Sequence, residues 1–207
     1  MMNSYQIGKR TLLEIERSQT RPSLLLHACC APCSTFPLKL LHRYFDITIF
    51  FNNSNIYPSN EYFRRLEELK KYISIFEQEN NCSIPLIETP YKGEEYEKYI
   101  SIRKDDPEKG PRCNLCFVTR LKEAYQYASD NGFNYFTTVM TISRQKDEQA
   151  LNKIGTVLQE FYPNTKFLVH NFKKKGGQEE RDALVRKYNL YSQTYCGCKF
   201  SINENNK

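Results

Sequence analysis

The chain has 207 residues and a formal net charge of +6, from 30 lysines and arginines against 24 aspartates and glutamates. A chain of this length is long enough to bury a hydrophobic core, and we expect residues 1–207 to form a single α/β domain. No stretch approaches the roughly 18 apolar residues of a membrane span, and residues 1–20 lack the apolar segment of a signal peptide. The sequence therefore argues against a membrane-spanning protein and predicts a cytoplasmic one with no membrane partner.

Hydrophobic spacing predicts a regular alternation of helices and strands. In chain order it predicts a helix over residues 4–18, a strand over 23–28, a helix over 32–41, a strand over 46–51, a helix over 59–79, a strand over 83–89, a helix over 91–103, a helix over 113–131, a strand over 134–140, a helix over 147–161, a strand over 166–172 and a helix over 178–187. Ser59 is placed to cap the helix that starts there. Such alternation is typical of parallel strands joined by right-handed crossovers. The predicted fold class is α/β, a three-layer sandwich with a mainly parallel sheet of about five strands.

Seven of the eight cysteines fall into three tight groups separated by long intervals. The groups are Cys29-Cys30-x-x-Cys33 after the first predicted strand, Cys113-x-x-Cys116 at the start of a helix, and Cys196-x-Cys198 in the C-terminal tail. The carboxyl ends of parallel strands share one edge of the sheet, where α/β folds place their chemistry. We therefore expect the three groups to meet at this edge, with the Cys-Gly-Cys tail closing a metal site.

Clustered thiols in a reducing compartment are more often metal ligands or redox groups than disulfides. Sets of four thiolates bind zinc or iron–sulfur clusters, because soft sulfur suits these metals. Seven thiols exceed the needs of one such centre, so we hypothesise two inorganic centres, or one centre plus redox thiols. Cys29 and Cys30 are adjacent, and we expect their side chains to diverge rather than to chelate one ion together with Cys33. A structural zinc knot that holds the tail is the alternative, and Cys82 is expected to be an ordinary cysteine.

The loop after the first strand lacks the glycine-rich turn with which α/β proteins cradle phosphates. ATP use is therefore not expected. The chain also lacks a dinucleotide fingerprint, so the electrons for a redox step would come from a separate donor. His27, at the end of the first strand, is expected to be a hydrogen-bonded core histidine rather than a ligand. Basic residues interleaved with aromatic ones suit a polyanion with unstacked bases.

With these motifs together, the chain resembles the epoxyqueuosine reductases of the QueH type. The matching stretches are His27 to Cys33, Asn53 to Tyr62, Arg112 to Phe117 with Arg120-Leu121, Thr137-Thr138, Asn171 to Lys174, and Gln193 to Cys198. They span nearly the whole chain in the order that the family shows. Two positions depart from the pattern: Ser192 stands where an arginine is expected, and Ser143-Arg144 stands where serine-proline is commoner. Both departures touch expected substrate contacts and leave the metal ligands intact.

The resemblance implies a fold akin to the adenine-nucleotide α-hydrolase (HUP-like) group. It also implies a 4Fe-4S cluster with a second metal ion, iron, beside it. The implied reaction is the last step of queuosine synthesis at the wobble position, in the anticodon loop of tRNA. The epoxide oxygen of epoxyqueuosine is removed without cobalamin, and two electrons from an external donor and two protons are consumed.

Carried onto this sequence, the resemblance assigns all seven grouped cysteines to the metal centres. The candidate cofactor ligands are Cys29, Cys30, Cys113, Cys116, Cys196 and Cys198, with Cys33 as a further metal ligand. The candidate proton donors, chosen because they lie in matched loops near the expected mouth of the site, are Tyr57, Glu61 and Tyr195. The candidate phosphate contacts are Arg64, Arg112, Arg144, Lys173 and Lys174. Two other interpretations stay open: a zinc-containing RNA-binding module, and a cluster-dependent tRNA sulfur transferase, which the missing glycine loop disfavours.

Overall fold

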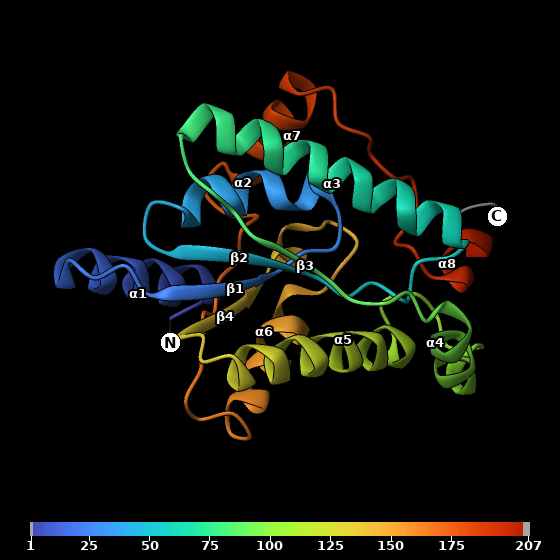
Figure 1. The fold of residues 1–207 in the computed structure, drawn as a ribbon. Helices are drawn as coiled ribbons and strands as arrows, with labels where there is room; N and C mark the ends of the chain where they lie inside the picture. Colours follow the sequence, from blue (N-terminus) through green and yellow to red (C-terminus); the bar gives the residue numbers. More distant parts are fainter. Residues whose placement is uncertain (1, 205–207) are drawn as a thin grey trace.

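A five-stranded, all-parallel sheet lies at the centre of the computed structural model, which describes residues 2–204 (Figure 1). The strand order is β3-β2-β1-β4-β5. In chain order the strands are β1 (Ser23–His27), β2 (Asp46–Phe51), β3 (Leu86–Glu88), β4 (Tyr135–Thr138) and β5 (Lys166–Phe167). The predicted α/β class, with a mainly parallel sheet of about five strands, is confirmed.

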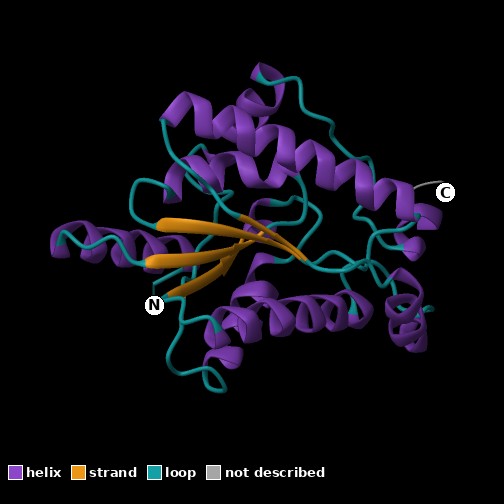
Figure 2. Cartoon of the chain, in the orientation of Figure 1, coloured by secondary structure: helices purple, strands orange, loops and turns teal. Residues whose placement is uncertain are grey.

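Helices cover both faces of this sheet. They are α1 (Ser4–Ser18), α2 (Ala31–Leu41), α3 (Ser59–Asn80), α4 (Gly93–Ile100), α5 (Pro111–Asp130), α6 (Glu148–Gln159), α7 (Gly177–Lys187) and α8 (Lys199–Glu204). Figure 1 shows α2, α3 and α7 on one side of the sheet and α5 and α6 on the other, and Figure 2 shows the strands enclosed between these two layers. Among the described helices, none combines the length and the apolar character that a membrane crossing requires.

The central strand β1 determines where a site can form. Its residues Leu24, Leu25 and Leu26 are all 0% exposed, as expected for a parallel strand that is covered on both faces. The chain places β2 and β3 on one side of β1 and β4 and β5 on the other. Where the order of the strands changes direction in this way, the connections on the two sides of β1 run apart. A crevice therefore opens beyond the carboxyl ends of the central strands. Here that crevice lies beyond β1 and β4.

The strand β1 ends one residue earlier than the hydrophobic run predicts, and β3, β4 and β5 are shorter by at least three residues, β3 having three residues. The strand β4 stops at Thr138, whose Oγ1 accepts a hydrogen bond from the backbone N–H of Met140 at 3.1 Å and starts a 3-10 turn (Val139–Ile142). The strand β5 has two residues instead of the predicted seven over 166–172. Beyond it, Asn152 of α6 bonds both the N–H and the C=O of His170, each at 3.2 Å. The side chain of Asn152 thus makes the two backbone hydrogen bonds that a neighbouring strand would otherwise make with His170.

The helices agree more closely with the predictions. The helix α1 has the predicted bounds, and Asn3 and Gln6 form a capping box at its start. The prediction that Ser59 caps α3 is wrong, because the helix begins at Ser59 and the residue before it, Pro58, makes no side-chain hydrogen bond to the helix. The short C-terminal helix α8 was not predicted.

Candidate metal centre

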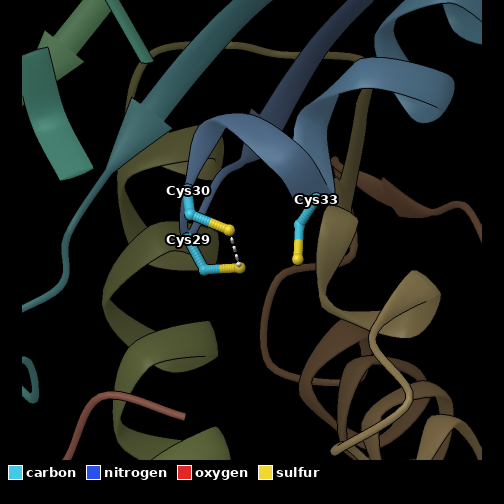
Figure 3. Close-up of side chains that lie close together, drawn as sticks. All are labelled: Cys29, Cys30 and Cys33. Atoms are coloured by element: carbon cyan, nitrogen blue, oxygen red, sulfur yellow. Dashed lines mark hydrogen bonds between the residues drawn. The ribbon is translucent and has the colours of Figure 1, made fainter. Parts of the chain in front are cut away.

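Three cysteine sulfurs converge directly after β1. Cys29 and Cys30 lie in the loop and Cys33 lies in the first turn of α2, and all three are at most 7% exposed. The Sγ atoms of Cys29 and Cys30 are 3.8 Å apart, and all three sulfurs lie within 4.8 Å of one another. Figure 3 shows these sulfurs turned toward a common space. The prediction that the side chains of Cys29 and Cys30 diverge and do not chelate one ion together with Cys33 is wrong. Cys30 is extended (φ −176°, ψ 164°), the helix starts at the next residue, and its first turn brings Cys33 back over the loop.

This spacing suits one metal ion. Four sulfurs at the usual zinc–sulfur distance of about 2.3 Å from a tetrahedral ion are about 3.8 Å apart, from the geometry of the tetrahedron. The sulfurs of Cys29 and Cys30 are separated by this distance. We call Cys29, Cys30 and Cys33 the triad. Among the residues that the structure describes, it is the one set of three or more histidine, cysteine or acidic residues whose ligand atoms all lie within 4.8 Å of one another.

The thiols of the triad polarise one another. Hydrogen bonds with Cys29 and Cys33 hold the pKa of the Cys30 thiol well below its usual range, while hydrogen bonds with Cys29 and then Cys30 raise the pKa of Cys33. Gln193, from the C-terminal tail, donates from Nε2 to the Cys30 sulfur at 3.1 Å. Of the three thiols of the triad, Cys30 is therefore the most easily ionised, which favours metal binding because thiolates are the ligating form.

The C-terminal tail is anchored over the cysteine loop by a buried ion pair. Arg65 of α3 bonds Glu61 at 2.7 Å and donates to the backbone carbonyl of Cys196 at 3.1 Å. Gly197 has φ +135°, a conformation that favours glycine, and a Cβ there would lie 3.1 Å from a guanidinium nitrogen of Arg65. The Gly197 carbonyl also accepts from the Tyr57 N–H at 2.8 Å. These contacts fix the position of the Cys-Gly-Cys segment.

The second cysteine group opens α5 beside this tail. The backbone N–H of Lys109 donates to the Cys113 sulfur at 3.2 Å. Burial, together with the charges of Cys196, Cys116 and Cys198, raises the pKa of Cys113 to about 12. The guanidinium of Arg112, the residue before Cys113, lies 5.1 Å from the ring centre of Phe200, two residues after Cys198, so the second and third groups lie together.

Two buried cations accompany the thiols without a carboxylate partner. Arg120 is 2% exposed and Lys146 is 6% exposed, and neither has an ion pair with an acidic residue within the described chain. Burial alone would lower the pKa of Lys146, but the charges of Cys196 and Cys29 raise it above its usual range. Burial alone would also lower the pKa of Arg120, but the charges of Cys116 and Cys29 raise it above its usual value. Thiolates at these positions, once formed, would be the counter-charges of both cations.

Arg120 also links the ends of β1 and β2. Its guanidinium donates to Asn53 Oδ1 and faces His27 Nε2 at 3.4 Å, while its own Nε has no partner among the described residues. Because Nε2 accepts from Arg120, His27 donates from Nδ1 to Thr138 at 2.7 Å. Burial, followed by the charge of Arg120, keeps the pKa of His27 well below its usual value. His27 is therefore a neutral, hydrogen-bonded core histidine, as predicted.

A cavity of about 230 Å³ joins the first and third cysteine groups. Its walls include Cys33, Lys146 and, from the tail, Tyr195 and Cys196. Arg144 lines its mouth and bonds Asp182 at 2.9 Å. The cavity therefore combines thiols, an ammonium group and a phenol, a set that fits a small polar group brought next to a thiolate-bound metal.

Of the three predicted proton donors, only Tyr195 lines this cavity. Its hydroxyl donates to the Tyr57 carbonyl, and burial raises its pKa. Tyr57 is 40% exposed and contacts the tail through its backbone. Glu61 accepts from Arg65 and, at 3.0 Å, from the hydroxyl of Tyr191. Tyr57 and Glu61 thus hold the tail that carries Tyr195.

The predicted phosphate contacts are dispersed. Arg64 is exposed, with its guanidinium 3.5 Å from the centre of the Tyr191 ring. Arg112 is 2% exposed and donates to backbone carbonyls of the loop before α5, at 2.9 Å for Lys104. Lys173 is half-buried and donates to the Lys146 carbonyl at 2.9 Å. Lys174 is exposed and lines a different recess.

Four residues of the site were not predicted as functional: Arg65, Arg120, Lys146 and Gln193. Arg65 follows Glu61 by four residues on one helix, so the sequence did contain the signal for that ion pair. Gln193 and Arg120 lie in stretches that matched the family pattern. The burial of Lys146 has no sequence signal, since it depends on how the loop after β4 packs.

The chain has close relatives among known proteins. Residues 24–204 match the family described as Epoxyqueuosine reductase QueH. The chain is 39% identical over 186 residues to Epoxyqueuosine reductase QueH of Streptococcus pyogenes, covering 90% of this chain and 72% of the relative. It is 37% identical to the protein of that name from Staphylococcus aureus over 97% of this chain and 84% of the relative. For Thermotoga maritima the identity is 32%, over 88% of this chain and 91% of the relative.

The parallel α/β fold, the thiol-rich edge and these relatives together define an oxidoreductase. More particularly, the chain belongs to the epoxyqueuosine reductase QueH family.

Proposed function

We propose that this chain reduces epoxyqueuosine to queuosine at the wobble position of tRNA, without cobalamin. The observation that carries the proposal is the meeting of three cysteine groups and two buried cations beyond the carboxyl ends of the central strands, in a chain of this family. The tRNA substrate follows from the family name, and it implies a cytoplasmic site of action.

The seven grouped cysteines would hold the inorganic cofactors, a 4Fe-4S cluster and a second metal ion, iron. Three features support this fit: the sulfur-rich donor set, the charges of Arg120 and Lys146 that offset thiolates, and the unpartnered Arg120 Nε, which is a donor for an added sulfur acceptor. When bound, the cluster supplies electrons and the adjacent ion acts as a Lewis acid. An external donor, such as a low-potential reduced protein or a chemical reductant, must supply the two electrons.

The protein residues have to manage two protons. Reduction breaks both C–O bonds of the epoxide, forms the C=C bond and releases the oxygen as water. Lys146 and Tyr195 both line the cavity beside the thiols. We assign Lys146 Nζ to bind the departing oxygen as a cation and Tyr195 Oη to deliver one of the two protons, and the second proton comes from water that enters the cavity. Glu61 and Tyr57 act indirectly, as positioning residues, because they hold the tail that carries Tyr195.

The tRNA would approach the mouth of the cavity. Arg144 lies at this mouth, and the exposed Arg64 and Lys174 offer further charge for phosphates. Lys173 would stabilise the position of Lys146, because it donates a hydrogen bond to the Lys146 carbonyl. Arg112 would hold the loop before α5 in place.

The test is turnover by protein prepared without oxygen and loaded with iron and sulfide. Dithionite serves as reductant and tRNA containing epoxyqueuosine as substrate, and the nucleosides are analysed by mass spectrometry after digestion. We expect queuosine to form, Cys116→Ala to abolish it and lower the iron content, and Cys82→Ala to leave it intact, since Cys82 lies outside the three groups. Loaded wild-type protein that forms no queuosine, or full activity of Cys116→Ala, would contradict the proposal.

A further inference from the structure

A second recess, of about 290 Å³, lies between α1, α2 and the loop after β5. We call it the lysine recess and define it by Tyr5, Lys9, Tyr44, His170, Lys174 and Lys175. Apolar residues of α1 and α2 complete its wall. None of the seven grouped cysteines lines it, so it is distinct from the cysteine cavity.

The recess carries a concentrated positive charge. Its lining includes three lysines and no acidic residue. Within the described chain, Lys9, Lys174 and Lys175 have no ion pair with a carboxylate, in contrast to the neighbouring Lys39, which bonds Glu180 at 2.5 Å. An anion would therefore meet three uncompensated ammonium groups at this position.

Aromatic rings form much of the remaining surface. Tyr5 and Tyr44 line the recess together with Phe36 of α2. His170 is 3% exposed and stacks on Phe172, with 4.3 Å between ring centres, and its Nδ1 has no hydrogen-bond partner within the described chain. Burial lowers the pKa of His170 to about 4, so the ring is neutral at pH 7 and retains one acceptor nitrogen. The wall thus offers the aromatic side chains of Tyr5, Tyr44 and Phe36, with the buried His170 ring behind them.

Cations beside aromatic faces are the combination with which proteins hold single-stranded nucleotides. The volume is close to the lower end of the range for small-molecule pockets, about 300 Å³, which suits one nucleotide rather than a large coenzyme. We propose that the lysine recess binds a phosphate and the adjacent base of the tRNA, at a nucleotide other than the one that is reduced. This rests on the proposed function.

Residues of α2 line both the recess and the cysteine cavity. Cys33 lines the cavity and Phe36 lines the recess, three residues apart on α2, which is about 4.5 Å of helix rise. Lys174 lines the recess, while the preceding residue, Lys173, donates to the carbonyl of Lys146 in the cavity wall. A strand that occupied both pockets at once would have its register set by the recess.

The experiment compares a double variant, Lys9→Gln with Lys175→Gln, with Lys153→Gln, an exposed lysine of α6 outside the recess. Loaded protein is titrated into epoxyqueuosine-containing tRNA at several salt concentrations, and anisotropy reports binding. With a slope of about 0.7 per phosphate contact on single strands, two lost contacts flatten the salt slope by about 1.4 and lower affinity about 25-fold at 0.1 M salt. The Lys153→Gln variant should match the wild type.

The other outcomes separate the two proposals. If the wild type binds and reduces the tRNA while the double variant keeps its affinity and salt slope, the recess assignment is wrong and the reductase stands. If the wild type does not bind this tRNA, both fail. Guanosine monophosphate is titrated in parallel: if it binds the wild type and not the double variant while tRNA affinity is unchanged, the recess takes a free nucleotide and the assignment to tRNA is overturned.

Discussion

Replacing Arg65 by methionine should release the C-terminal tail. The Arg65 and Glu61 side chains are 2% and 10% exposed, and they form an ion pair at 2.7 Å. Arg65 also donates to the carbonyl groups of Cys196, at 3.1 Å, and Tyr195, at 3.4 Å. Removing one partner of a buried ion pair costs about 3–5 kcal/mol, because the remaining charge stays buried without compensation. We expect Arg65→Met to lower the free energy of unfolding by this amount.

The assay is urea unfolding of the metal-free, reduced protein, followed by circular dichroism. Arg64→Met is the matched control, since Arg64 is the adjacent arginine but only stacks on the exposed side of Tyr191, a contact worth about 0.5–1 kcal/mol. Adding Glu61→Gln to Arg65→Met removes the unpaired carboxylate and should restore part of the loss. If Arg65→Met and Arg64→Met lower the free energy of unfolding by the same amount, to within about 0.5 kcal/mol, the buried ion pair does not anchor the tail.

Three further predictions address protonation, catalysis and binding. The pKa of His170 falls from 6.5 to about 4 on folding, so the unfolded chain binds more protons between these two pH values. The free energy of unfolding should therefore drop by about 3 kcal/mol as the pH falls from 6.5 to 4. The His170→Phe variant should lack this part of the loss when urea unfolding is measured at each pH. Lys146→Met should lower turnover at saturating tRNA at least tenfold or so while Lys146→Arg retains more; equal rates at equal iron content would contradict its role. Arg144→Ala should reduce the salt slope of tRNA binding by about 1, and an unchanged slope would remove Arg144 from the phosphate contacts.

Local patterns determined the elements that the sequence could predict. The apolar run of β1 and the spacing in α1 depend on neighbouring residues only, and α1 was predicted with its observed bounds. The position of the thiols at the sheet edge followed from strand–helix alternation, since parallel connectivity brings all carboxyl ends of the strands together.

The remaining features depend on contacts between distant segments. The strand β5 ends early because Asn152 of α6 takes over the hydrogen bonds of His170, 18 residues later. The convergence of Cys29, Cys30 and Cys33 depends on the abrupt change from extended chain to helix at residue 30. The burial of Lys146 depends on the 3-10 turn after β4, which no hydrophobic period reveals.

We propose that the cysteine-rich edge of the sheet holds redox-active iron. Iron, zinc and acid-labile sulfide should be measured per chain, with a visible spectrum, on protein prepared without oxygen. We predict about four or five iron and four sulfide, with the broad visible absorption of an iron–sulfur cluster. Stoichiometric zinc without sulfide or colour, persisting after attempted cluster reconstitution, would contradict the reductase mechanism and indicate a zinc-containing RNA-binding module.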